Sequence, residues 1–158
     1  MIPTVVESHL RQHHPRFELH HHSVAETAQE LAAVEHVAGR RVAKPVVVKL
    51  DGELAIAVVA ATDRVSLSAI EEATAARAEL AGERELAERF APCEAGAEPP
   101  LAMFGVPILV DDRLLHEPTL IMPAGTHEDA IVLDTHEWAA CERVQPIANL
   151  GLRVSPFV

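Results

Sequence analysis

The sequence is poor in several residue types that mark specialised protein classes. It has two cysteines, one tryptophan, no tyrosine and, among its 13 basic residues, only two lysines, Lys44 and Lys49. Cys93 and Cys141 match neither a zinc-ligand spacing nor a disulfide framework, so we expect two reduced thiols. No apolar stretch reaches the roughly 18 to 20 residues of a membrane span, and the N-terminus lacks the apolar core of a secretion signal. These absences predict a cytoplasmic protein with no membrane partner.

The residues that are abundant are aliphatic. Of the 158 residues, 49% are hydrophobic, and alanine, valine and leucine dominate. A chain of this length buries roughly two thirds of its unfolded surface as one unit, so we expect a single domain over residues 1–158. The net charge of −11 argues against nonspecific binding to nucleic acid, because neutralising phosphates requires clustered basic side chains. Any polyanion would approach the N-terminal third, near Arg40, Arg41 and Lys44.

Helical and strand-like periodicities alternate irregularly along the chain. This order predicts an α+β (mixed α/β) domain, with a curved, mixed and largely antiparallel sheet flanked by helices. A capping box at Ser68 and Glu71 and a cap at Thr135 are expected to begin two of the helices. No glycine-rich loop joins a strand to a helix, so we expect neither a doubly wound fold nor a cofactor. The predicted helices are 4–13, 23 or 26 to 37, 68–76, 83–90 and 135–144, and the predicted strands are 16–21, 44–50, 54–61, 78–80, 107–110, 120–122 and 130–133.

Lys49 interrupts an apolar strand. It precedes an Asp51-Gly52 turn, which is a strong hairpin signal between two apolar runs. The even-length loop predicts that Lys49 pairs with Leu54, which places the lysine on the bulkier apolar face of the hairpin. Burying an ammonium group is costly, so it must reach water, a counter-ion or a ligand. A lysine that snorkels out at the sheet edge and a lysine that lines a binding pocket both fit this pattern.

The common catalytic and metal-binding patterns are absent. His20, His21 and His22 lie on a predicted strand, where side chains alternate between faces, so at most two of them can converge. A zinc site needs three or four ligands, and we therefore expect no metal there. No serine lies in a Gly-x-Ser-x-Gly elbow, and Cys93 has no nucleophile signature. A covalent mechanism is disfavoured.

Two further features could serve a binding site. Gly96, Ala97, Glu98, Pro99 and Pro100 form a loop whose backbone cannot join a regular ladder, which would leave amide and carbonyl groups free for a ligand. A rigid surface connection is the alternative. His127 precedes the predicted strand 130–133 and could donate a hydrogen bond or move a proton near neutral pH. A lone histidine is more often structural than catalytic, so the catalytic interpretation gains weight only if His127 meets Lys49 in space.

Four segments occur in a characteristic order. They are His22-Ser23-Val24-Ala25-Glu26-Thr27 before a helix, Val47-Val48-Lys49-Leu50 in the hairpin, Gly96 to Pro100 as G-x-x-x-P, and Gly105-Val106-Pro107-Ile108 leading into Val110-Asp111. Together they resemble the YbaK family of free-standing aminoacyl-tRNA deacylases, which is related to the editing insertion domain of bacterial prolyl-tRNA synthetase. The resemblance spans roughly residues 5–144.

The resemblance implies a trans-editing hydrolase that cleaves the ester of a mischarged tRNA, with cysteine or alanine attached to proline tRNA. Lys49 and His127 would then be catalytic, while His22 and the loop Gly96 to Pro100 would bind the substrate. Water could attack the ester directly if the carbonyl is oriented and its developing charge is stabilised. The implied partners are the 3′ end of an aminoacyl-tRNA and an aminoacyl-tRNA synthetase. The alternative is a binding module that recognises an aminoacyl end, or a related acylated ligand, without turnover. The oligomeric state is left open.

Overall fold

The hairpin around Asp51 and Gly52 forms the centre of the larger sheet. In the computed structural model, which describes residues 1–153, strand β2 (Ala43–Leu50) pairs with β3 (Glu53–Ala60) in an antiparallel ladder. Lys49 lies opposite Leu54, as predicted. Asp51 and Gly52 have φ angles of 49° and 86°, and positive values at both central residues are those of a type I′ turn, whose twist suits a two-residue hairpin.

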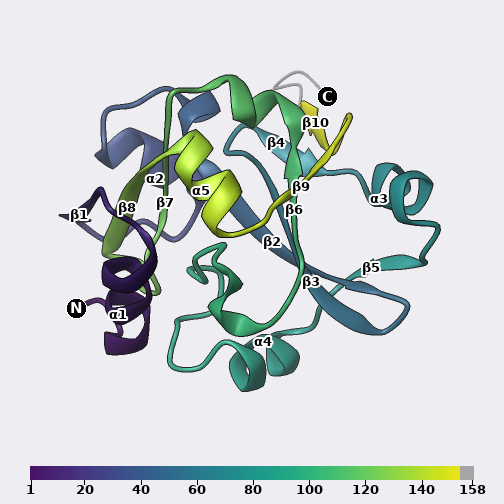
Figure 1. The fold of residues 1–158 in the computed structure, drawn as a ribbon, viewed down its shortest axis with the longest axis horizontal. Helices are drawn as coiled ribbons and strands as arrows, with labels where there is room; N and C mark the ends of the chain where they lie inside the picture. The colour runs from purple at the N-terminus through teal and green to yellow at the C-terminus, as the bar shows by residue number, and fades with distance from the viewer. Residues whose placement is uncertain (154–158) are drawn as a thin grey trace.

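The strands form three sheets (Figure 1). The larger one has the order β5-β2-β3-β6-β9, in which β2 pairs antiparallel with both β5 and β3, while β6 pairs parallel with both β3 and β9. A three-stranded antiparallel sheet, β1-β8-β7, lies beside it and is linked to it by a bridge between Val42 and Ile121. The predicted α+β class is confirmed, although its strands are divided among separate sheets. The remaining strand bounds are β1 Phe17–His21, β4 Asp63–Val65, β5 Ala78–Leu80, β6 Ile108–Asp111, β7 Thr119–Pro123, β8 Asp129–Asp134, β9 Gln145–Ile147 and β10 Gly151–Arg153, with β4 and β10 as the third sheet.

Five α-helices cover the sheets in the described residues. The largest hydrophobic cluster joins inward-facing residues of β2, β3 and β6 to those of β7 and β8, and Leu10 and Trp138 close it from two helices. Ile70 packs on the opposite face of the larger sheet. Over residues 1–153, each helix is too short or too polar to cross a bilayer. The helices are α1 Thr4–His13, α2 Ala28–Val34, α3 Leu67–Thr74, α4 Glu83–Arg89 and α5 Thr135–Cys141, with 3₁₀ turns at Gly39–Arg41, Ala102–Phe104 and Asp112–His116.

Helices α1, α4 and α5 begin where predicted, at Thr4, Glu83 and Thr135, but the caps of α3 and α5 and the start of α2 differ from the predicted ones. Ser66, and not Ser68, caps α3 by accepting the Ala69 N–H at 3.1 Å. Asp134 rather than Thr135 caps α5, since a carboxylate is also a strong N-cap acceptor. Helix α2 begins only after Thr27, whose hydroxyl accepts the Glu30 N–H. In each case a nearby side chain with equal capping ability competes for the helix start.

Strands β4, β9 and β10 were not predicted. Each has three residues, which is too short for a period-2 pattern to stand out. Their pairing depends on contacts distant in sequence, since β4 pairs with β10 and β9 pairs with β6. Such short strands are defined by their partners and not by their own composition.

Asp111 holds the end of β6 to β10 and to the following turn. Its carboxylate accepts hydrogen bonds from Arg113 Nε at 3.1 Å, Arg113 Nη2 at 2.6 Å and the Gly151 N–H at 2.8 Å. Gly151 is required here, because a Cβ at that position would lie 2.6 Å from Asp111 Oδ2. Burial raises the pKa of Asp111, but these hydrogen bonds outweigh burial and hold it below its usual value of 3.8.

We therefore expect Asp111→Asn to lower the free energy of unfolding by about 2 kcal/mol at neutral pH, because charge-assisted hydrogen bonds are lost from a buried site. The folded-state pKa is depressed, so this stabilisation is present above pH 3.8 and is lost as the pH falls through the lower folded-state value. Urea denaturation at pH 7 and at pH 3 measures both effects. An equal difference between parent and variant at the two pH values would contradict the assigned cause.

Candidate active site: a cleft at the open edge of strand β2

Strand β2 has an unpaired stretch along one edge. Strand β5 pairs only with Val48 to Leu50, and the bridge to the smaller sheet involves Val42. Between these contacts, the edge of β2 that faces away from β3 has no strand partner in the described residues. Pro45 lies in this stretch, and proline is tolerated in a strand at an edge because its missing N–H leaves no ladder bond unmade.

A cleft opens at this edge. It has two adjoining parts that share lining residues: a narrow one of about 40 Å³ and a wider one of about 470 Å³, and the wider one is within the range of small-molecule sites. The N-terminus of α2, the loop at residue 96 and the start of β2 form its shared wall. Both parts are lined by Glu26, Thr27, Ala28, Lys44, Pro45 and Gly96.

Three predicted site residues meet in the narrower part of the cleft, namely His22, Gly96 and His127, and a fourth, Glu98, lines the wider part. The His127 ring lies 3.6 Å from where a Cβ on Gly96 would stand, and its Nε2 is 3.1 Å from the Ala95 carbonyl oxygen. His22 Nδ1 contacts the Ser23 carbonyl oxygen at 2.7 Å, while His22 Nε2 is buried with no hydrogen-bond partner among the described residues. A buried polar atom without a partner is costly, and a ligand in this cleft would give His22 one.

The loop from Gly96 to Pro100 is held by its own residues. Glu98, only 2% exposed, accepts the Gly96 N–H at 2.5 Å and lines the wider part of the cleft. Burial raises the pKa of Glu98 above its usual value. Ala97, Pro99 and Pro100 are buried behind this surface. The amide of Gly96 is thus engaged by a carboxylate in this structure, in contrast to the predicted loop with free amides.

Lys44 supplies the cationic group of the cleft. It lines both parts and donates a hydrogen bond from Nζ to the Asp63 carbonyl oxygen. Partial burial lowers the pKa of Lys44 below its usual value, and the negative charge of Asp63 opposes that shift. A partly desolvated ammonium group interacts more strongly with a developing negative charge than one in bulk water.

Lys49 does not line the cleft. Its ammonium group is 3.6 Å from Glu79 on β5 and 3.4 Å from Glu85 on α4. The predicted apolar face is correct, because Val47 and Ile56 from that face belong to the main core. The charge is satisfied there by two carboxylates, and the structure does not bring Lys49 together with His127 in the described cleft.

The extent of the family match decides where the chain belongs. Residues 22–141 match the model of the aminoacyl-tRNA editing domain. The chain is a member of that family. The matched segment of the editing domain contains all the residues that line the cleft, and the predicted resemblance to the YbaK family is confirmed. A comparison with curated proteins finds no match.

Solved structures share the fold of the editing domain at low sequence identity. The hypothetical protein APE2540 superposes with a TM-score of 0.84 at 19% identity, over 93% of this chain and 99% of that one. A candidate trans-editing enzyme for prolyl-tRNA synthetase gives a TM-score of 0.81 at 16% identity, over 98% and 100% of the two chains. A candidate signal transduction protein from Marinobacter aquaeolei VT8 gives 0.71 at 17%, over 92% of this chain and 30% of that one.

Besides Lys44, the cleft residues Thr27 and Asp129 of the editing domain were not predicted as site residues from the sequence. Thr27 caps α2 at the cleft wall. Asp129, 5% exposed, accepts hydrogen bonds from Thr126 Oγ1 at 2.5 Å and His21 Nδ1 at 3.0 Å, and thereby holds the turn that carries His127. Burial raises the pKa of Asp129, but these bonds and the terminal ammonium bring it below its usual value. The sequence signal that could have identified Thr27 was the predicted start of a helix shortly after His22, because Thr27 caps that helix.

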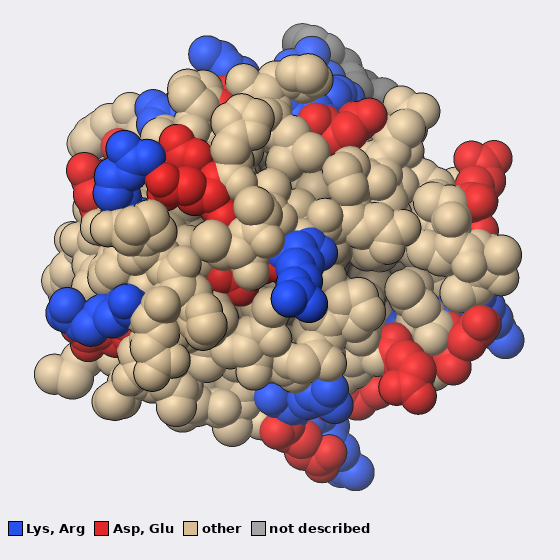
Figure 2. Space-filling model, in the orientation of Figure 1, with Lys and Arg blue, Asp and Glu red and all other residues tan. Residues whose placement is uncertain are grey.

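Charges on the editing domain are mixed. On the face shown in Figure 2, basic and acidic groups lie side by side in small clusters, separated by uncharged surface. Ion pairs in the described residues include Arg16 with Glu137 and Arg113 with Asp111, at 2.6 Å each. This face offers no continuous basic surface in the described residues, in keeping with the net charge of −11.

Cys93 of the editing domain should be an unreactive thiol. Burial, and to a smaller extent the charge of Glu98, raise the pKa of Cys93 to about 11. At pH 8 only about one thousandth of it would be thiolate, which is the reactive form. We expect iodoacetamide to alkylate the exposed Cys141 much faster than Cys93, as measured by mass spectrometry of the native protein. In urea the two should react alike, and equal rates in the native protein would contradict the burial of Cys93.

Proposed function

We propose that this editing domain acts in trans as an aminoacyl-tRNA deacylase, which hydrolyses the ester of proline tRNA mischarged with cysteine or alanine. The observation that carries the proposal is the cleft at the open edge of β2, where Lys44, His22 and His127 converge inside the family-matched segment. The structural likeness to a candidate trans-editing enzyme for prolyl-tRNA synthetase supports the choice of tRNA.

The chemistry requires few protein groups. An aminoacyl ester is activated, so water can attack it once the carbonyl is oriented and its developing charge is stabilised. Lys44 would stabilise that negative charge or hold the terminal phosphate. His127, with Nε2 directed at the Ala95 carbonyl oxygen, would orient the group that enters beside Gly96. His22 Nε2, buried and without a partner among the described residues, would hydrogen-bond to the substrate.

The assignment of Lys49 as the catalytic lysine stays a prediction and competes with Lys44. Lys44 is favoured because it lines the cleft together with both histidines. Lys49 would need to leave Glu79 and Glu85 to act on a substrate there. Variants of the two lysines separate these assignments.

A panel of mischarged tRNAs tests the function. Proline tRNA carrying alanine, cysteine or proline, and alanine tRNA carrying alanine or serine, are incubated with catalytic amounts of the protein, and the remaining ester is measured over time. We expect loss of alanine or cysteine from proline tRNA, with proline retained. A panel in which no ester is lost faster than in buffer would overturn the proposal.

A binding module without turnover is the second candidate. It is favoured by Glu98, whose carboxylate already engages the Gly96 N–H that could otherwise stabilise an oxyanion. In the same panel, such a module would bind the 3′ end of an aminoacyl-tRNA and protect the ester. An aminoacyl-tRNA synthetase would then be its natural partner, because the captured tRNA must be delivered to an enzyme for editing.

A further inference from the structure

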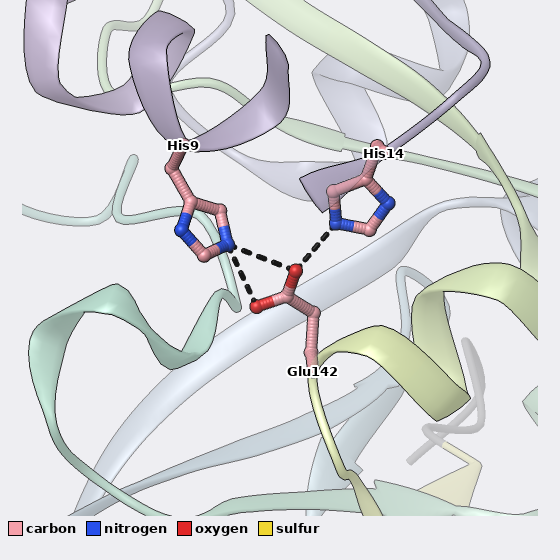
Figure 3. Close-up of side chains that lie close together, drawn as sticks. All are labelled: His9, His14 and Glu142. Carbon is pink, nitrogen blue, oxygen red and sulfur yellow. Dashed lines mark hydrogen bonds and ion pairs between the residues drawn. The ribbon is translucent and has the colours of Figure 1, made fainter. Parts of the chain in front are cut away.

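A second cluster of ionisable groups lies away from the cleft. His9 on α1, His14 just beyond α1 and Glu142 at the end of α5 point toward one another (Figure 3). Glu142 is 133 positions from His9 and 128 from His14. None of the three belongs to the family-matched segment 22–141 or to the lining of the cleft. The cluster therefore needs an explanation separate from editing.

The three side chains converge closely. His9 Nε2 lies 3.0 Å and 2.9 Å from the two carboxylate oxygens of Glu142, and His14 Nε2 contacts Glu142 Oε2 as well. One nitrogen of each histidine and one oxygen of the glutamate lie within 4.8 Å of one another. Tetrahedral bonds of about 2.0 to 2.2 Å to a shared zinc ion place the ligand atoms about 3.4 Å apart, so these side chains would admit the ion by moving slightly apart from their present hydrogen-bonded contacts.

The three side chains are more buried than those of an ordinary surface ion pair. The side chains of His14 and Glu142 have 0% exposure and that of His9 has 13%. His14 Nδ1 is buried without a hydrogen-bond partner among the described residues, so Nε2 is the ring nitrogen that contacts Glu142. The converging ligand atoms are thus largely shielded from bulk water.

The carboxylate is also fixed from behind. The Ala102 N–H donates to Glu142 Oε1 at 2.7 Å, which orients the group and leaves Oε2 directed at His14. A backbone donor that holds a carboxylate in place is a typical outer contact of a metal ligand. The site is therefore supported by three separate parts of the chain, namely α1, α5 and the turn at Ala102.

We propose that His9, His14 and Glu142 bind one zinc ion, with the fourth position open to water. Two imidazoles and one carboxylate are a known zinc ligand set. The ion replaces the protons that the imidazoles otherwise share with Glu142, and it joins the N-terminal helix α1 to the C-terminal helix α5. Its role is to stabilise this junction, since the ligands lie outside the cleft lining.

Zinc titration of the full chain tests the site. Metal-free protein is titrated with zinc chloride at pH 7.5 by calorimetry, and cobalt chloride is added in parallel to record the visible absorption of a four-coordinate ion. We expect one tight equivalent and a rise in melting temperature with zinc, because a ligand that binds only the folded state stabilises it. His9→Ala, the least buried ligand, is expected to weaken binding by about 10-fold or more.

Two further variants help to interpret the zinc titration. His136→Ala removes an exposed histidine from α5 and should leave affinity unchanged. Glu142→Gln keeps an acceptor for the Ala102 N–H while removing the charge, and circular dichroism shows whether it folds. Weak binding by folded His9→Ala and Glu142→Gln supports the site. Equal zinc affinity in parent and His9→Ala, or binding that is lost only when His20 to His22 are replaced, overturns it.

Discussion

Replacing Lys44 with methionine is expected to lower the rate of deacylation by about 100- to 1,000-fold, the usual cost of removing one group that stabilises a developing oxyanion. Methionine keeps the length and apolar stem of the side chain. The fold should survive, because the substitution removes one hydrogen bond, to the Asp63 carbonyl oxygen, at a cost of about 1 kcal/mol. Single-turnover rates on alanine-charged proline tRNA measure the effect.

Lys49→Met is the matched control. It removes the ion pairs to Glu79 and Glu85, whose side chains are 53% and 39% exposed, and such exposed pairs contribute little to stability. Its deacylation rate should stay within about twofold of the parent. If Lys49→Met is inactive while Lys44→Met retains full activity, the assignment of the cleft lysine is wrong and the prediction from the hairpin holds.

Replacing Trp138 with alanine is expected to lower the free energy of unfolding by about 3 to 5 kcal/mol, which is typical for deleting a buried aromatic side chain. Trp138 is 0% exposed and belongs to the main core. Its Nε1–H also donates to the Pro100 carbonyl oxygen at 2.9 Å, so the same residue anchors the end of the Gly96 to Pro100 loop. Urea denaturation followed by circular dichroism is the measurement, because the variant lacks the chain's one tryptophan.

Trp138→Phe separates packing from anchoring. It retains most of the apolar volume but leaves the Pro100 carbonyl oxygen without its donor, so we expect a loss of about 1 to 3 kcal/mol. If that loop binds substrate, KM should rise. Leu152→Ala, at a residue that is 44% exposed, should cost less than about 0.5 kcal/mol. Comparable losses for Leu152→Ala and Trp138→Ala would contradict the described core.

The hairpin shows what local sequence can predict. Asp51-Gly52 and the apolar alternation on either side specified both the turn and the register, including Lys49 opposite Leu54. These features depend on neighbours within a few residues. The partners of the Lys49 charge do not depend on near neighbours, because Glu79 and Glu85 reach it from other elements. Sequence could state that a counter-ion or ligand was needed, but not which.

Lys44 was missed for a similar reason. It precedes Pro45, and proline within a strand indicates an edge, but that signal does not say what lies beside the edge. The cleft exists because β5 begins to pair only at Val48 and the smaller sheet touches β2 at Val42. The family resemblance did predict four cleft residues, His22, Gly96, Glu98 and His127, because it carries spatial information that periodicity lacks.

The open edge of β2 also bears on self-association. Alternate residues of an antiparallel strand direct their N–H and C=O groups to the same neighbour, and the Val47 carbonyl accepts the Ala81 N–H on the β5 side. Pro45, two residues earlier, therefore presents its carbonyl and no donor to the open side. An intruding strand from another molecule would find a short edge with a missing hydrogen bond, which natural sheets use against aggregation. The edge can thus remain accessible to a small polar ligand while resisting β-strand addition at high protein concentration.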